Sequence, residues 1–513
     1  MRKRVLSAGV LAVFCVLAFC TVGIAASDAE RVVNIAYQGI ADSFLTDKQI
    51  SVAESVSHAQ IYDTLLTKDL EGNFHPSLAE SWEVSDEGKT YAFVMRKDIK
   101  WQDGEKFTAA DVKFTVEHML KAPAFSWVYQ DVESMELVDE MTIKMRLKNP
   151  NSVLLSLVSS TFYGLIMPKH AVEKFGDSYG TSPETTVGTG AYIVTDWKPD
   201  VSITYKAKED YFGGAPAIKT VVLHQVNDSN SAIVALQTGE LDIYLVPISG
   251  NEHKTLSTNK DIAIGEYLSG RNEAIYMYCK DGMFKDIRMR KAIALAVNKE
   301  DYITVGVDGL GKIINYPGDI GPGVTANPDF VPETKYEQDI EKAKALVEEA
   351  GQTGKPIVVK SYNTAPYPAL ATYIQSILTE IGLNATVEPM ERATFLSQVD
   401  SEQVPILPFS WWDDTYDFDQ MMGVSIYSKN VGTAGNYSYY IDPEVDKMVD
   451  AARAESDIAK RKEIYKEIVN KYLEDIPFVS MYATRGAIAR RSDLSTKDTR
   501  SIRMVDYFWG NQK

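Results

Sequence analysis

The sequence predicts an α/β fold with more than one lobe. Residues 355–390 read as strand, helix and strand, a βαβ unit in which a crossover helix joins two parallel strands. Short apolar strands and amphipathic helices alternate through the rest of the chain. The 513 residues also exceed one folding unit, because such units average roughly 100 to 200 residues. We therefore expect separate lobes that are joined by short crossings, since no low-complexity linker is visible.

The first 26 residues are typical of a secretory signal peptide. Basic residues at positions 2–4 precede an apolar stretch over 5–22, and the small residues that end at Ala26 suit a signal peptidase. We therefore expect export to the periplasm. Cys20 stands where a lipid-modified cysteine would stand, but the bulky Phe19 before it favours simple cleavage over a lipid anchor. No other apolar run approaches the roughly 18 to 20 residues that span a bilayer.

The next part of the chain predicts a strand, a helix and a hairpin. Branched apolar residues predict a buried strand over 31–38. Apolar residues at helical spacing predict a helix over 52–67. Alternating residues on both sides of Asp86-Glu87-Gly88 predict a hairpin over 82–101, in which the glycine supplies a positive φ.

A capping signal marks the following helix. Thr108 is followed three residues later by Asp111, an arrangement like a capping box, and an apolar stripe continues beyond it. This pattern predicts a helix over 109–121. Strands are expected again over 133–147 and 191–206.

A second half begins near residue 270. Amphipathic patterns predict helices over 286–303 and 339–351, and Gly351 is a suitable stop for the latter. The βαβ unit follows, and then an apolar run over 405–414 that ends in polar residues. A long helix with one exposed face is predicted over 461–475.

Charge and cysteine content exclude some classes of function. The formal net charge of −18 disfavours nucleic acid as a partner, because binding to phosphates is driven by the release of counterions around a cationic surface. Cys279 is the sole cysteine after residue 26, so the exported chain cannot form an internal disulfide. Its setting, IYMYC, alternates like a strand, which favours a packed cysteine over a nucleophile.

One segment carries a specific family resemblance. The sequence PSLAESWEVSDEGKTYAFVMRKDIKWQDGEKFTAADVKFTVEHM, at 76–119, closely resembles the hallmark of family 5 extracellular solute-binding proteins, the peptide, nickel and oligopeptide class that serves ABC importers. Other pieces that are similar to this family lie in the expected order at 61–66, 188–194, 235–243, 284–303, 336–351 and 355–390.

The resemblance implies a fold and a function. It implies a two-lobed, type II periplasmic-binding-protein-like α/β fold, with the ligand cleft between the lobes. Lobe I would span 27–268, with an inserted subdomain at about 60–185, and lobe II would span 269–480; the chain would then return to lobe I over 481–513. It also implies a monomer without cofactor or metal, and without catalytic residues. This protein would bind a small peptide or another amine-bearing solute and deliver it to the permease subunits of an ABC importer.

The segment FSWWDDTYDFD, at 409–419, is the leading candidate for ligand binding. Two tryptophans and four carboxylates come at the end of a predicted apolar strand and directly after it. In α/β folds, binding groups usually lie at this end of a strand. The resemblance aligns Asp414 with the aspartate that pairs with the ligand's ammonium group in dipeptide-binding members. Trp411 or Trp412 could pack on the ligand, but alternation along a strand allows only one of them to face the cleft. Asp417-Phe418-Asp419 departs from the family's Asp-Pro-Asp.

Further candidates come from two other segments. Lys360 lies near the position where dipeptide-binding relatives carry an arginine for the ligand carboxylate, and Tyr362 and Asn363 stand beside it. From lobe I, the residues that could line the opposite wall are Tyr37, Phe44 and Thr189.

Alternative functions remain open at this point. Paired carboxylates could serve a secreted glycosidase as acid and base. Asp413, Asp414, Asp417 and Asp419 could form an oxygen-rich Ca²⁺ loop, although the glycine and distal glutamate of an EF-hand are lacking. Within the family, oligosaccharides and nickel are alternative ligands, but the six histidines show no paired spacing for a metal.

Overall fold

The computed structural model describes residues 31–49, 51–69, 73–122, 125–126, 128–319, 330–412, 415 and 417–494. For Leu268 and Trp412 it describes the backbone alone. The predictions of a signal peptide over 1–26 and of cleavage rather than lipidation at Cys20 lie outside these residues. Asp413 and Asp414 also lie outside them.

A long mixed sheet runs through both halves of the molecule. Its strands follow the order β15-β14-β16-β12-β17-β11-β1-β10-β9-β8, and β13 adds to β17. The bounds are β1 Val32–Tyr37, β8 Tyr192–Lys198, β9 Ser202–Ala207, β10 Thr220–Gln225, β11 Ile243–Tyr244, β12 Ile262–Met277, β13 Gly311–Ile313, β14 Pro356–Tyr362, β15 Asn384–Met390, β16 Ile406–Trp412 and β17 Phe478–Arg491.

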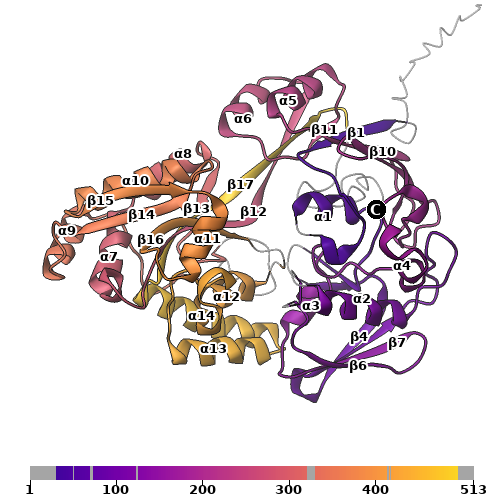
Figure 1. Ribbon diagram of the computed structural model, residues 1–513, viewed down its shortest axis with the longest axis horizontal. Helices are drawn as coiled ribbons and strands as arrows, with labels where there is room; N and C mark the ends of the chain where they lie inside the picture. Colours follow the sequence, from indigo (N-terminus) through magenta and orange to yellow (C-terminus); the bar gives the residue numbers. More distant parts are fainter. Residues whose placement is uncertain are drawn as a thin grey trace, which may run out of the picture.

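Two long strands connect the halves. β12 and β17 pair antiparallel along most of their length, with a register shift between Leu268 and Asn272. Beyond this shift β12 also pairs with β16, whereas the far end of β17 pairs with β11. In Figure 1 both strands pass from one group of elements to the other. We call the elements from β1 to α6 lobe I and those from α7 to α14 lobe II. The boundaries expected at 268/269 and 480/481 fall on these two strands.

Lobe I carries a second sheet of its own. The four strands follow the order β4-β5-β7-β6, beside the hairpin β2-β3. Their side chains form an apolar core around Trp101 that is separate from the core of the main sheet. The bounds are β2 Leu66–Lys68, β3 Phe74–Pro76, β4 Ala79–Ser85, β5 Thr90–Met95, β6 Val132–Leu137 and β7 Thr142–Leu147. These strands lie between residues 66 and 147. The insertion expected at about 60–185 stays a prediction.

Helices cover both lobes. Those of lobe I are α1 Val52–His58, α2 Ala109–Lys121, α3 Val153–Leu157, α4 Lys169–Phe175, α5 Ser229–Thr238 and α6 Gly250–Leu256. Those of lobe II are α7 Ile287–Ala296, α8 Lys299–Val307, α9 Ile340–Glu349, α10 Tyr367–Glu380, α11 Arg392–Asp400, α12 Val424–Ile426, α13 Pro443–Ala454 and α14 Ile458–Asp475, with a π-helical turn, η7, at Asp419–Gly423. Among the described residues, no helix combines the length and the apolar character that crossing a membrane requires.

Local sequence signals predicted several elements correctly. The capping box of Thr108 and Asp111 is formed at the start of α2. β4 and β5 form the predicted hairpin, although Asp86 and Glu87 share the positive φ with Gly88. β14, α10 and β15 form the predicted βαβ unit, with the two strands parallel.

Two predicted helices were too long. The helix predicted over 52–67 ends at His58. The chain there turns so that the Ile61 carbonyl accepts a hydrogen bond from Gly190, at 2.8 Å. Tertiary packing therefore overrides helical spacing at this point. The helix predicted over 286–303 is two helices, because Asn298 caps α8 by accepting from the backbone of Asp301.

Candidate functional site

The candidate ligand segment leaves lobe II where two parallel strands end. β14 and β16 run parallel, so Tyr362 and Trp412 end at the same edge of the main sheet. The segment after β16 enters η7 at Asp419. Polar groups at such an edge are well placed for binding, as the sequence suggested.

An arginine from a neighbouring helix holds the middle of this segment. The guanidinium of Arg461, on α14, donates to both oxygens of Asp417, at 2.9 and 2.7 Å. Both side chains are almost fully buried. Burial alone would raise the pKa of Asp417, but the charge and hydrogen bonds of Arg461, together with the Lys68 charge and a backbone hydrogen bond, outweigh burial and hold the pKa of this carboxyl below its usual value.

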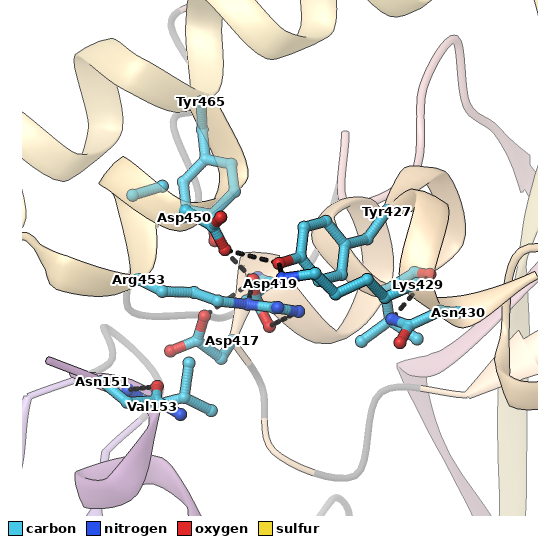
Figure 2. A network of polar contacts seen from close by, with 12 residues as sticks. Asn151, Val153, Asp417, Asp419, Tyr427, Lys429, Asn430, Asp450, Arg453 and Tyr465 are labelled. Carbon is cyan, nitrogen blue, oxygen red and sulfur yellow. Dashed lines mark hydrogen bonds and ion pairs between the residues drawn. The ribbon is translucent and has the colours of Figure 1, made fainter. Parts of the chain in front are cut away.

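A second arginine holds the end of the segment. Arg453, on α13, donates to the two oxygens of Asp419 at 2.8 and 3.1 Å. Figure 2 shows the guanidinium between Asp419 and the ring of Tyr427, whose centroid is 4.7 Å from Cζ. The Tyr427 hydroxyl donates in turn to Asp450, at 2.6 Å. Asp417 and Asp419 are therefore neutralised inside lobe II, which argues against their use in a Ca²⁺ loop or as a catalytic carboxylate pair.

Side chains of lobe I reach the same segment. The Lys68 ammonium, on β2, donates to the carbonyl oxygen of Thr415. Ser156, on α3, donates through its hydroxyl to Asp417 Oδ2, at 3.1 Å. Next to these contacts, the backbone N–H of Ser152 donates to the Arg453 carbonyl, at 2.8 Å. The segment is thus contacted by both lobes.

Of the two tryptophans, Trp411 is the one whose side chain the structure describes. Trp411 packs against the lobe II core, with its ring 6.1 Å from that of Tyr437. Its indole N–H donates to the Gln420 carbonyl, at 2.8 Å. Trp411 therefore lies with the core. The side chain of Trp412 lies outside the described residues.

The β14 candidates are engaged within lobe II. Lys360 donates to Gln398 Oε1 at 2.6 Å, and its side chain is only 13% exposed. Tyr362 is buried, with its ring 5.1 Å from that of Tyr367. Asn363 is exposed at the strand end. The geometry thus leaves Asn363 open to solvent, whereas Lys360 and Tyr362 serve packing in this conformation.

The three lobe I candidates do not form one surface. Tyr37 ends β1 and is partly exposed, and burial raises the pKa of its hydroxyl. Phe44 is fully buried against the ring of Trp197, at 5.2 Å. Thr189 is also fully buried and donates to Asp63, at 2.9 Å. Phe44 and Thr189 therefore lie in the core of lobe I rather than on a solvent-facing wall.

Comparison with known proteins identifies the family. The model of bacterial extracellular solute-binding proteins, family 5, matches residues 73–433, well over half of the chain. The chain belongs to this family. The predicted family and two-lobed fold are thereby confirmed.

Relatives of this family 5 protein match along most of their length. The di/tripeptide-binding protein 2 of Pseudomonas aeruginosa is 26% identical over 451 residues, covering 82% of this chain and 83% of that protein. The oligopeptide-binding protein AppA of Bacillus subtilis is 26% identical over 473 residues, covering 85% and 82%. The periplasmic binding protein DppA of Helicobacter pylori, solved with the peptide STSA, has a TM-score of 0.75 at 23% identity, covering 93% and 97%.

Sequence reasoning missed a polar cluster of this family 5 chain that joins β12, β16 and α10. Arg271, on β12, donates to Ser410 Oγ at 2.8 Å and to the Tyr367 hydroxyl at 3.0 Å. Beside it, Glu273 is 1% exposed, and neither of its carboxylate oxygens has a hydrogen-bond partner within the described ranges. Burial raises the pKa of Glu273 to about 8. A basic and an acidic residue inside an apolar strand near 270 could have indicated this cluster.

Cys279 of this family 5 chain is packed, as predicted. Cys279 Sγ lies 3.1 Å from the Met277 carbonyl oxygen. Burial raises the pKa of the thiol to about 12, so the thiolate that a nucleophile requires is scarce at neutral pH.

Proposed function

We propose that this protein is the substrate-binding component of an ABC importer, which captures a small peptide or a related amine-bearing solute. Membership of a solute-binding family supports this proposal, as do relatives that are named for di-, tri- and oligopeptides. The solute is bound outside the cytoplasmic membrane and passed unchanged to the permease subunits. The protein acts as a monomer and needs no cofactor.

One structural observation carries the proposal. The segment that follows β16 is fixed to lobe II by Arg461 and Arg453 and is contacted from lobe I by Lys68 and Ser156. A solute that is bound at this segment can therefore interact with both lobes. Such a solute binds the closed state better than the open one, and only this difference in affinity can shift the population.

Asp414 is the proposed anchor for the ligand's ammonium group. Of the four carboxylates over 413–419, Asp417 and Asp419 are paired with arginines. Asp413 and Asp414 are the remaining candidates in this segment, and the resemblance to dipeptide-binding members of the family favours Asp414. A carboxylate that pairs with an ammonium group forms a charge-assisted hydrogen bond, and leaving this charge unpaired disfavours ligands without an amine.

A ligand panel tests the proposal. Isothermal calorimetry of the mature protein would measure the Kd of dipeptides, tripeptides, their N-acetyl analogues, cello-oligosaccharides and Ni²⁺. We expect free-amine peptides to bind most tightly. Asp414→Asn should weaken their binding by about 1.5 kcal/mol or more, since a charged hydrogen bond is lost.

The neighbouring carboxylate supplies the matched control. Asp413→Asn makes the same chemical change one residue away, and we expect it to leave the Kd within about twofold, because the proposal assigns the ammonium contact to Asp414 alone. An unchanged Kd for Asp414→Asn would discard Asp414 as the anchor. Tight binding of oligosaccharides or Ni²⁺, without binding of peptides, would overturn the proposed ligand class.

A further inference from the structure

We propose that Lys68 and Ser156 of lobe I form a latch with Thr415 and Asp417 of lobe II, and that this latch sets ligand affinity by stabilising the closed state before any ligand binds. The inference rests on the proposed function, because it assigns positioning residues to the same ligand segment.

The first contact of the latch joins an ammonium to a backbone carbonyl. Lys68 donates to the carbonyl oxygen of Thr415, 347 residues away, and its ammonium also lies 3.4 Å from Ser156 Oγ. The ammonium group of Lys68 also lies near the ring of Phe74, 5.7 Å from the ring centroid. Hydrogen bonds that involve a charged donor are stronger than neutral ones, and partial burial protects them from screening by salt.

The second contact joins a hydroxyl to a buried carboxylate. Ser156 is fully buried on α3 and donates to Asp417 Oδ2. Arg461 already holds Asp417 in place from lobe II. Ser156 therefore meets an acceptor whose position does not depend on the ligand, so the contact forms whenever the lobes close.

The latch lies apart from the strands that join the lobes. In Figure 1, α3 lies beside α13, far from the crossing of β12 and β17. The bond from Ser152 to the Arg453 carbonyl confirms that these elements touch. Bending at the crossing strands would therefore separate Lys68 and Ser156 from their partners. Opening must break the latch, whereas closing forms it.

The latch affects binding through the fraction of the protein that is in the closed state. When only the closed state holds the ligand on both sides, the apparent Kd rises as the closed fraction falls. Removing the latch should therefore weaken every ligand by the same factor. Removing an ammonium anchor, in contrast, should weaken free-amine ligands alone.

The experiment compares Lys68→Met and Ser156→Ala with the mature wild-type protein. Lys113→Met is the matched control, because Lys113 is a partly exposed lysine of the same subdomain whose ion pair, with Glu117, stays within α2. Small-angle scattering gives the radius of gyration without ligand. Calorimetry gives the Kd of the tightest-binding dipeptide of the panel and of its N-acetyl analogue.

We expect both latch variants to have a larger radius of gyration without ligand. Both peptides should bind about fivefold or more weakly, by equal factors. Lys68→Arg should recover part of the affinity, and Lys113→Met should match the wild type. Wild-type scattering and affinity in both Lys68→Met and Ser156→Ala would overturn the latch, as would a loss of affinity confined to the free-amine peptide. If the wild type binds no peptide, the proposed function fails, and the scattering data alone decide on the latch.

Discussion

The guanidinium of Arg461 donates two hydrogen bonds to the Asp417 carboxylate, at 2.9 and 2.7 Å, in a site where both side chains are almost fully buried. Such a bidentate pair fixes both partners in orientation as well as in distance. It joins α14 to the segment that carries the proposed ligand anchor. The stability of lobe II and the shape of the ligand segment therefore depend on the same pair.

Breaking this pair should destabilise the protein strongly. Asp417→Asn keeps the shape of the side chain but leaves the Arg461 charge buried and uncompensated, which typically costs about 3 kcal/mol or more. Urea unfolding at neutral pH would measure the loss of unfolding free energy. Glu463→Gln is the control, because it breaks an exposed ion pair with Lys466 and should cost less than about 0.5 kcal/mol. Equal effects of the two variants would contradict the prediction.

Glu273 should make stability fall as the pH rises. Its pKa is raised from 4.5 to about 8 in the folded protein, so between these values the folded state keeps a proton that the unfolded state has lost. The free energy of unfolding then decreases by up to about 1.4 kcal/mol per pH unit over this range and levels off above it.

The variant Glu273→Gln tests this dependence. The amide stays neutral, so urea unfolding between pH 4.5 and 9 should show a smaller decline than in the wild type. The two proteins should have similar stability near pH 4.5 and differ most near pH 9. Parallel curves would show that Glu273 does not titrate as stated.

The Cys279 thiol should resist modification in the folded protein. Since burial raises its pKa to about 12, a disulfide reagent at pH 8 meets very little thiolate. The absorbance of the released reagent group reports the reaction of the thiol. We expect this absorbance to rise slowly in native buffer, and to rise rapidly in guanidinium chloride to the value for one thiol per mature chain. Reaction of the native protein as fast as that of free glutathione would refute the packed environment.

Chelators should not affect this protein. Asp417 and Asp419 are paired with arginines, and the described part of the chain contains no group of three or more residues suited to hold a metal ion. Calorimetric titration with Ca²⁺ should therefore give no saturable heat, and EDTA should leave the Tm unchanged. A saturable heat would restore the calcium alternative.

Local signals in the sequence predicted much of the fold. The capping box at Thr108, the hairpin around Gly88 and the βαβ unit over 355–390 each depend on residues that are close in the chain, and the structure contains all three. The helix predicted over 52–67 ended early because Ile61 contacts Gly190, which lies in a remote segment. Contacts between remote segments produce no periodic pattern of residues in the sequence, so the sequence alone does not reveal them.

The candidate site was harder to predict for the same reason. The segment over 409–419 became the leading candidate because its tryptophans and carboxylates follow an apolar strand. Lys68 and Ser156 were missed, because their partners are 347 and 261 residues away. The burial of Phe44 could not be read from residue type, since aromatic side chains occur both in cores and on binding surfaces.

The two crossing strands also bear on how the chain matures. Lobe I completes its sheet and its core with residues of β17, among them Ala487, Ile488 and Ala489. A nascent chain therefore cannot finish its N-terminal lobe until nearly the whole polypeptide has been synthesised. Truncated products should remain sensitive to proteolysis, and neither lobe is suited to separate expression.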